Sequence, residues 1–65
     1  MKKYQIRDAF QDYLHGKRAY HITNFSLLLK NPRPIPDHTD FMATLEAELA
    51  KVAYYDELVR VHNEI

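Results

Sequence analysis

The segment DHTDFMATLEAELAKVAYYDELVRVH (residues 37–62) decides the fold, because it is the one long periodic pattern in the chain. Its apolar residues recur at steps of three or four, which places them on one face of an α-helix. They are Phe41, Leu45, Leu49, Val52, Tyr55 and Val59. Pro36 precedes the segment, and Asp37 or Thr39 can cap the first amides. The pattern therefore predicts a helix of about seven turns.

The size of the chain limits what it can be. It has 65 residues and no cysteine, and 28% of its residues are charged. We expect a single small helical domain over residues 1–65, near the lower size at which a chain folds alone. Small domains are commonly completed by disulfides, a metal or a second subunit. Because cysteine is absent, disulfides and thiolate zinc sites are excluded, and association with another protein or a second copy is expected.

Two shorter helices are predicted upstream. Residues 3–15 have apolar side chains at helical spacing, and Gly16 follows where a helix end favours glycine. Residues 19–31, AYHITNFSLLLKN, offer a second helical face, although Tyr20 and Ile22 also suit a strand. A lone strand would need a partner outside the chain, which favours the helix. The expected inward faces are Ile6, Ala9, Phe10, Tyr13 and Leu14 in the first helix and Ile22, Phe25, Leu28 and Leu29 in the second.

The segment between the second and third helices predicts a stiff connector. Residues 31–36, NPRPIP, alternate proline with other residues, which fixes φ and removes amide donors. The expected fold is all-α, a small three-helix domain with a short, a medium and a long C-terminal helix. Either the first two helices run along the long helix, or its C-terminal half projects and a homodimer completes the domain.

Charge is unevenly distributed although the net charge is zero. Residues 1–36 carry seven cationic and two anionic side chains, and residues 37–65 carry two cationic and seven anionic ones. The two halves are expected to pack on each other, or on the opposite halves of a second copy. The alternative is a nucleic-acid surface of cations interleaved with tyrosines, although the acidic helix would repel phosphates. Its expected contact residues are Lys3, Arg7, Lys17 and Arg18.

Catalytic and metal-binding patterns are weak. His38 stands beside Asp37 and two residues before Asp40, but both aspartates also suit helix capping. The four histidines lack metalloprotease spacing. Glu46 and Glu48 point to different sides of a helix, which is wrong for a pair of catalytic carboxylates. We therefore expect no enzyme activity, no cofactor, no metal site and no small-molecule substrate.

The aromatic content favours a binding surface instead. Five tyrosines and three phenylalanines are many for 65 residues, and tyrosine is enriched at protein interfaces. Tyr54 and Tyr55 point in two directions around a helix, so one of them is expected outside the intrachain core. The pattern predicts a protein–protein interaction module, either a regulator, an adaptor or an inhibitor, that binds another protein, itself included. The alternative is a small DNA- or RNA-binding transcriptional regulator. The expected partner-binding residues are Leu49, Val52, Tyr54, Tyr55, Leu58 and Val59.

Localisation is expected to be cytoplasmic, with no membrane contact. The longest aliphatic run, residues 27–29, is too short to span a bilayer. The first ten residues, MKKYQIRDAF, lack the apolar stretch of a secretory signal.

Overall fold

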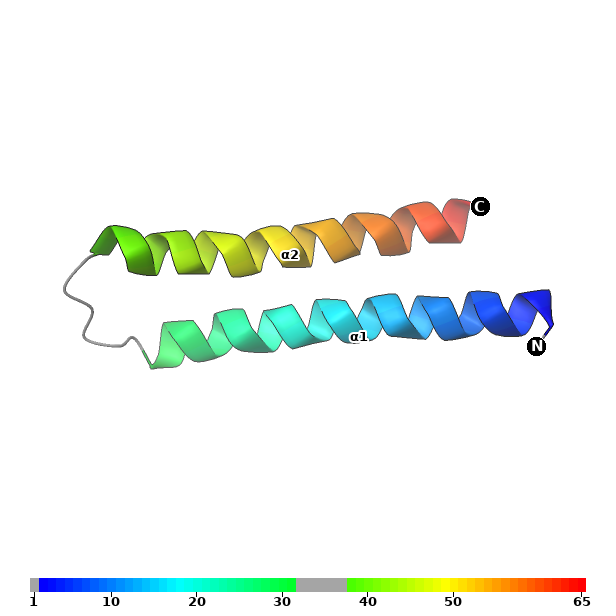
Figure 1. Cartoon of the computed structure of the whole chain (residues 1–65), viewed down its shortest axis with the longest axis horizontal. Helices are drawn as coiled ribbons and strands as arrows, with labels where there is room; N and C mark the ends of the chain where they lie inside the picture. Colours follow the sequence, from blue (N-terminus) through cyan, green and yellow to red (C-terminus); the bar gives the residue numbers. More distant parts are fainter. Residues whose placement is uncertain (1, 32–37) are drawn as a thin grey trace.

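Two long helices lie side by side and antiparallel in the computed structural model, which describes residues 2–31 and 38–65 (Figure 1). Helix α1 spans Lys3–Lys30 and helix α2 spans His38–Glu64. The hairpin is elongated, with extents of 52 × 17 × 14 Å, and both chain ends lie at the same end of it. The expected all-α class is confirmed, and the described residues contain no strand.

The first helix is continuous where the sequence predicts two. Residues 3–15 and 19–30 both belong to α1, with Asn31 directly after its end, so the part of the chain that is described holds two helices rather than three. Gly16 lies inside α1 without a positive φ, and a Cβ placed on it would meet no atom within 4 Å. Glycine in a helix interior costs only about 1 kcal/mol relative to alanine. The contacts that α1 makes along the rest of its length offset that loss, which corrects the helix end expected at Gly16.

The helix ends are held by local contacts. At the start of α1 the backbone N–H of Lys2 donates to Gln5 Oε1 at 2.9 Å. At its end the N–H of Asn31 donates to the carbonyl of Leu27 at 2.9 Å. Asp40 lies in the first turn of α2, where a carboxylate suits the helix dipole. The predicted connector, residues 31–36, lies outside the described residues except for its first position, as does Asp37.

The residues of each helix that face the other helix form a strip that we name the seam. They follow alternating steps of four and three residues in both helices, a seven-residue repeat typical of helices that pair as a coiled coil. All of them are buried or half-buried. The seam consists of Arg7, Gln11, Leu14, Arg18, His21, Phe25 and Leu28 of α1 and Phe41, Leu45, Glu48, Val52, Tyr55, Val59 and His62 of α2.

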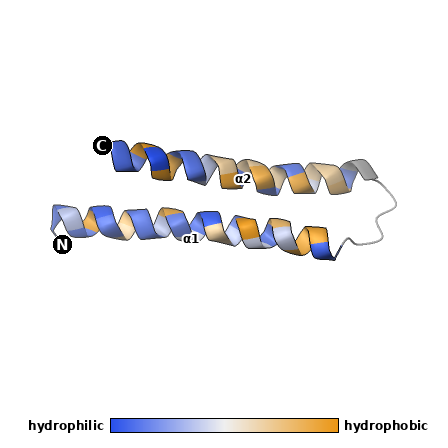
Figure 2. Ribbon diagram, turned by 180° about the vertical axis from the view of Figure 1, so that it is seen from behind, coloured by the Kyte–Doolittle hydropathy of each residue, from blue (hydrophilic) through white to orange (hydrophobic). Residues whose placement is uncertain are grey.

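The seam buries little apolar surface completely. Leu14, 1% exposed, is the one fully buried apolar side chain among those that the structure describes. Phe25, Leu28, Phe41 and Leu45 make the connector end of the seam apolar, and each is half-buried. The ribbon of α1 is more hydrophobic towards the connector and more hydrophilic towards the chain ends (Figure 2). A two-helix hairpin of this kind leaves much of its apolar surface outside.

Neither described helix contains an apolar stretch long enough to cross a membrane. The compartment therefore stays a prediction from the sequence.

Candidate protein-interaction surface

Polar side chains join the two helices near the chain ends. Arg7 Nη2 donates to the backbone carbonyl of His62 at 3.0 Å. His62 Nδ1 lies 2.5 Å from Gln11 Oε1, and the edge of the His62 ring meets the Phe10 ring at a centroid distance of 5.3 Å. These contacts hold the open end of the hairpin together.

A second polar cluster occupies the middle of the seam. His21 is 6% exposed, and its Nδ1 lies 2.7 Å from Glu48 Oε2. Asn24 Nδ2 donates to the same oxygen at 3.4 Å, and the Tyr55 ring stacks on His21 at 5.9 Å. The hydrogen bond from His21 is the largest cause that lowers the pKa of Glu48 below its ordinary value of 4.5. The ionised carboxylate is therefore the favoured form of Glu48 in the folded hairpin.

Large apolar side chains lie exposed or half-buried along one side of the hairpin. In α1 they recur every seven residues, which is close to two turns, so they lie in one line along the helix. Tyr54 and Val61 of α2 have the same spacing. We name this side the aromatic face, and it consists of Ile6, Phe10, Tyr13, Tyr20, Leu27, Tyr54, Leu58 and Val61.

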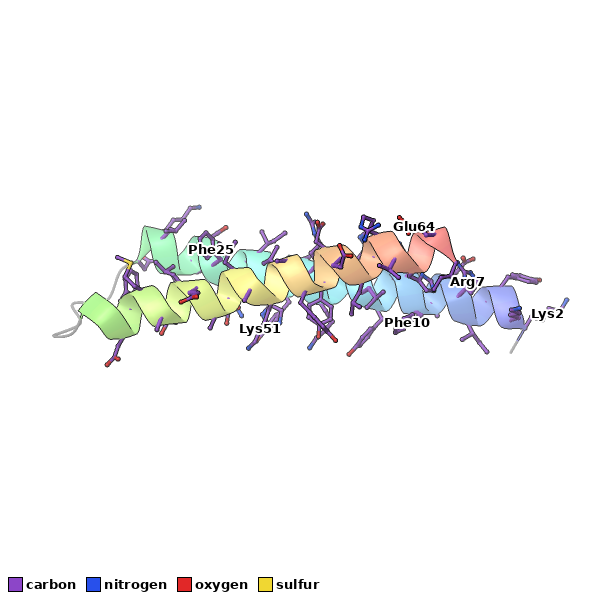
Figure 3. All side chains as sticks on the ribbon, turned by 90° about the horizontal axis from the view of Figure 1, so that it is seen from above. Lys2, Arg7, Phe10, Phe25, Lys51 and Glu64 are labelled. Carbon is purple, nitrogen blue, oxygen red and sulfur yellow. The ribbon has the colours of Figure 1, made fainter. Side chains whose placement is uncertain are left out.

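Both helices contribute to the same side. Phe10 of α1 and Lys51 of α2 lie on one side of the hairpin when it is viewed along the plane of the two helices (Figure 3). Lys17 Nζ lies over the Tyr55 ring at 5.9 Å, and the Tyr55 ring meets the Tyr54 ring at 4.9 Å. These contacts bring the lysine of α1 and the exposed tyrosine of α2 together on the aromatic face.

Two shallow grooves between the helices border this face. One lies near the chain ends and the other near the connector. The groove near the chain ends is lined by Lys3, Ile6, Arg7, Phe10 and His62. The groove near the connector is lined by Asn24, Leu27, Leu28, Asn31, Thr44 and Glu48. Because Ile6, Phe10 and Leu27 belong to the aromatic face, both grooves open on it. The aromatic face is therefore hollowed at these two places.

The structure separates the residues that the sequence predicts for partner binding. Val52, Tyr55 and Val59 are half-buried in the seam, against α1. Leu58 is half-buried and Tyr54 is 58% exposed, and both belong to the aromatic face. The prediction that one of the two adjacent tyrosines lies outside the intrachain packing is confirmed for Tyr54.

Leu49 lies on the other side of the seam. It is 52% exposed, although its spacing predicted an inward position, and Glu48 takes the seam position instead. Leu49 precedes Asp56 by seven residues and so lies on the same side of α2 as this carboxylate, which pairs with Arg18. Met42, seven residues earlier, is exposed there too. Its exposed large apolar side chains, Met42 and Leu49, are aliphatic rather than aromatic.

The expected inward faces of the first two segments are also corrected in part. Ile6, Phe10 and Tyr13 are exposed, and only Leu14 of that set is buried. Leu29 is 57% exposed. The apolar side chains of α1 therefore outnumber the positions that α2 can cover, and the surplus forms most of the aromatic face.

Three of the four cations predicted to bind nucleic acid contact α2. Arg18 Nε donates to Asp56 Oδ1 at 2.9 Å. Arg7 donates to a backbone carbonyl and Lys17 lies over a tyrosine ring, as described above, whereas Lys3 is exposed. The structure thus does not gather these four side chains into one free basic patch.

Among the described side chains, no group of three or more potential metal ligands comes together. Of the candidate site at the start of α2, Asp37 and the side chain of His38 lie outside the described residues.

The seam residues that the sequence interpretation missed are mostly polar. Apolar spacing alone places none of His21, Glu48 and His62 on an inward face. The signal that identifies them is the repeat of four and three steps, which becomes continuous only when polar residues are counted with the apolar ones.

A comparison of the chain with known protein families, curated proteins and solved structures finds no match. The functional proposal therefore depends on the surface described above.

Proposed function

We propose that the protein is a protein–protein interaction module, acting as a regulator, adaptor or inhibitor, and that its binding surface is the aromatic face. One observation carries the proposal. Tyr13, Tyr20 and Tyr54 are each more than half exposed on one side of a hairpin that fully buries only Leu14 among its described apolar side chains. Covering such apolar area is favourable, and tyrosine is among the residues that dominate binding energy at interfaces.

The proposed mechanism is packing of a partner onto a surface that is already formed. The seam contacts hold α1 and α2 side by side, so few groups need to be ordered when a partner binds. The tyrosine rings supply apolar contact area while their hydroxyl groups keep hydrogen bonds to water or to the partner. The two grooves receive side chains of the partner between the helices.

Capture of proteins from the native cell lysate tests this proposal. The tagged chain is compared with a Tyr13→Glu and Tyr54→Glu double variant, which places two charges on the aromatic face. We expect the double variant to lose a stoichiometric protein that the original chain retains. Leu49→Glu, an exposed apolar residue on the other side of the seam, is the matched control and is expected to retain it.

Circular dichroism of each variant shows whether the helices persist. Equal capture by all three chains, with equal helicity, would rule out the aromatic face as the binding surface.

Single-stranded nucleic acid is the second candidate ligand, because Lys3, Lys17 and Lys51 flank the tyrosines of the aromatic face. Lysines beside exposed rings are typical of surfaces on which bases stack. Binding to a labelled oligonucleotide is expected to weaken steeply between about 50 and 200 mM salt, and a Lys17→Glu and Lys51→Glu variant is expected to lose it. Absence of binding at the lower salt concentration removes this candidate.

A further inference from the structure

We infer that a second copy of the chain covers the aromatic face, so that two hairpins form a four-helix bundle with both connectors at the same end. The inference rests on the proposed function and names the partner of the same surface.

The two helices carry opposite charge. Helix α1 has five cationic and two anionic side chains, and α2 has two cationic and six anionic ones. When two hairpins meet face to face, each helix gains one neighbour from the second copy. If α1 lies on α2 of the second copy, each basic helix is flanked by two acidic helices and the two basic helices lie diagonally apart. Of the acidic side chains of α2, Glu48 pairs with His21, Asp56 pairs with Arg18, and Glu57 and Glu64 pair with Arg60. The opposite net charges of the helices therefore favour this pairing by long-range attraction and not by ion pairs across the aromatic face.

The seam contacts show which residues of α1 and α2 are level along the hairpin. His21 contacts Glu48, and Lys17 lies over Tyr55. Because the helices are antiparallel, each residue further along α1 corresponds to one residue further back along α2. Counting from these contacts places Lys17 at the same height along the hairpin, or level, with Tyr54, and Tyr20 level with Lys51. All four side chains lie on or beside the aromatic face.

A twofold axis parallel to the helices preserves these levels in the dimer. It lays α1 on α2 of the second copy without shifting either along the axis. Lys17 of one copy then faces Tyr54 of the other, and Tyr20 faces Lys51 of the other, so that each lysine meets an aromatic ring. Cations over tyrosine rings are favourable, more so when water is excluded. Phe10 faces Val61 in the same arrangement, which adds apolar contact near the chain ends.

A twofold axis perpendicular to the helices gives the competing arrangement, with the connectors at opposite ends. It lays α1 on α1 of the second copy. Lys17 is close to the middle of α1, so it would approach its own counterpart, and the two basic helices would become neighbours. Like charges at that distance oppose association, which selects the arrangement with both connectors at one end.

Sedimentation equilibrium over a range of protein concentrations tests the self-association. We expect a dimer whose dissociation constant rises by roughly tenfold or more in Tyr20→Lys and in Tyr54→Lys, because each change places two lysines opposite each other in the dimer, and by much less in the control Leu49→Lys. Circular dichroism confirms that each variant is helical. A monomer at every concentration overturns the inference. In that case the lysate experiment still decides the proposed function, because loss of capture in the aromatic-face variant identifies another protein as the partner.

Cysteine cross-linking tests the arrangement, and the absence of native cysteine makes each introduced thiol unambiguous. A chain carrying Leu27→Cys is mixed with a chain carrying Thr44→Cys, since these positions are level and both line the groove near the connector. We expect a disulfide between the two chains on oxidation. Two results together contradict the inferred arrangement. No disulfide forms in the mixture, and chains carrying Lys17→Cys form disulfide-linked pairs with each other.

Discussion

His21 and Glu48 show how single polar residues define this hairpin. Both stand at seam positions where paired helices usually carry apolar side chains. The imidazole and the carboxylate satisfy each other at 2.7 Å, and no buried polar side-chain atom among those described lacks a hydrogen-bond partner. A polar pair inside a seam stabilises less than an apolar pair but penalises every register that separates the two groups. These residues therefore select the register of α1 against α2.

Acid is expected to weaken the hairpin through Glu48. Its pKa is lowered in the folded chain, mainly by the hydrogen bond from His21, and desolvation opposes this only in part. The stabilisation is therefore fully present above the ordinary pKa of 4.5 and is lost as the pH falls through the lower folded value. Urea unfolding at a series of pH values measures this loss. Glu48→Gln is expected to reduce the dependence on pH, whereas the exposed control Glu46→Gln is expected to retain it.

Gly16→Ala is expected to stabilise the protein. Gly16 lies inside α1, has no positive φ and leaves open space where a Cβ would stand. Alanine removes conformational freedom from the unfolded chain and should raise the free energy of unfolding by about 0.5–1 kcal/mol. The reverse change at a nearby exposed site, Ala19→Gly, should lower it by a similar amount. Chemical denaturation at a fixed protein concentration measures both, and a destabilised alanine variant would contradict the geometry at Gly16.

At the scale of the helices, the seam is apolar near the connector and polar at His21 and Glu48 in its middle. Leu14 follows as an apolar contact, and the seam is polar again near the chain ends. Leu14 is the described apolar side chain with the least solvent contact. The other apolar seam residues are only half-buried. The pairing of α1 with α2 therefore depends strongly on this one position.

Leu14→Ala is expected to lower the free energy of unfolding by about 2–5 kcal/mol, because truncation of a buried leucine removes apolar burial and leaves a cavity. For a small domain this is a large share of the total stability, and helical circular dichroism should fall at room temperature. The same truncation at an exposed site, Leu29→Ala, should change stability by no more than about 0.5 kcal/mol. Similar melting of the two variants would show that Leu14 is not the central contact.

The sequence predicts the helical class and the extent of α2 but not the continuity of α1. The long helix was predictable because residues 37–62 keep one apolar periodicity, and α2 departs from that range by one residue at its start and two at its end. The helix end expected at Gly16 was wrong because the preference of glycine for helix ends is a local effect. Contacts along the whole of α1 outweigh it. Local preference is weak compared with such packing.

The surface was harder to predict than the helices. The sequence interpretation assigned Phe10 and Tyr13 to the interior because apolar side chains at helical spacing usually face inward. With a single helix opposite, α1 has two apolar faces and only one can be covered. Which of them faces α2 is decided by polar partners such as Asn24 and Glu48, and their pairing is visible only in three dimensions.

For the whole molecule, opposite charge on α1 and α2 supports both the hairpin and the inferred dimer. Among the described residues, Arg18 and Asp56 form the ion pair between the helices in which neither partner is a histidine. Both side chains are exposed, so salt screens their attraction. Long-range attraction between the basic and the acidic helix adds to this pair.

Salt is therefore expected to weaken the dimer. Raising sodium chloride from about 0.1 to 1 M shortens the screening length from about 10 to about 3 Å, so attraction between helices of opposite charge fades. The dissociation constant from sedimentation should rise with salt, and it should rise less in an Arg18→Gln and Asp56→Asn double variant. A dissociation constant that is independent of salt would assign the association to apolar contact alone.

Both chain ends lie at the same end of the hairpin, and this position determines how the molecule responds to mechanical force. A pull applied between the two ends acts across the helices rather than along them. The tension is therefore borne first by the contacts of Arg7 and Gln11 with His62, then by Leu14, and only later by the layers near the connector. Contacts loaded one after another yield at lower force than contacts loaded together, so the hairpin should open like a zipper from its polar end.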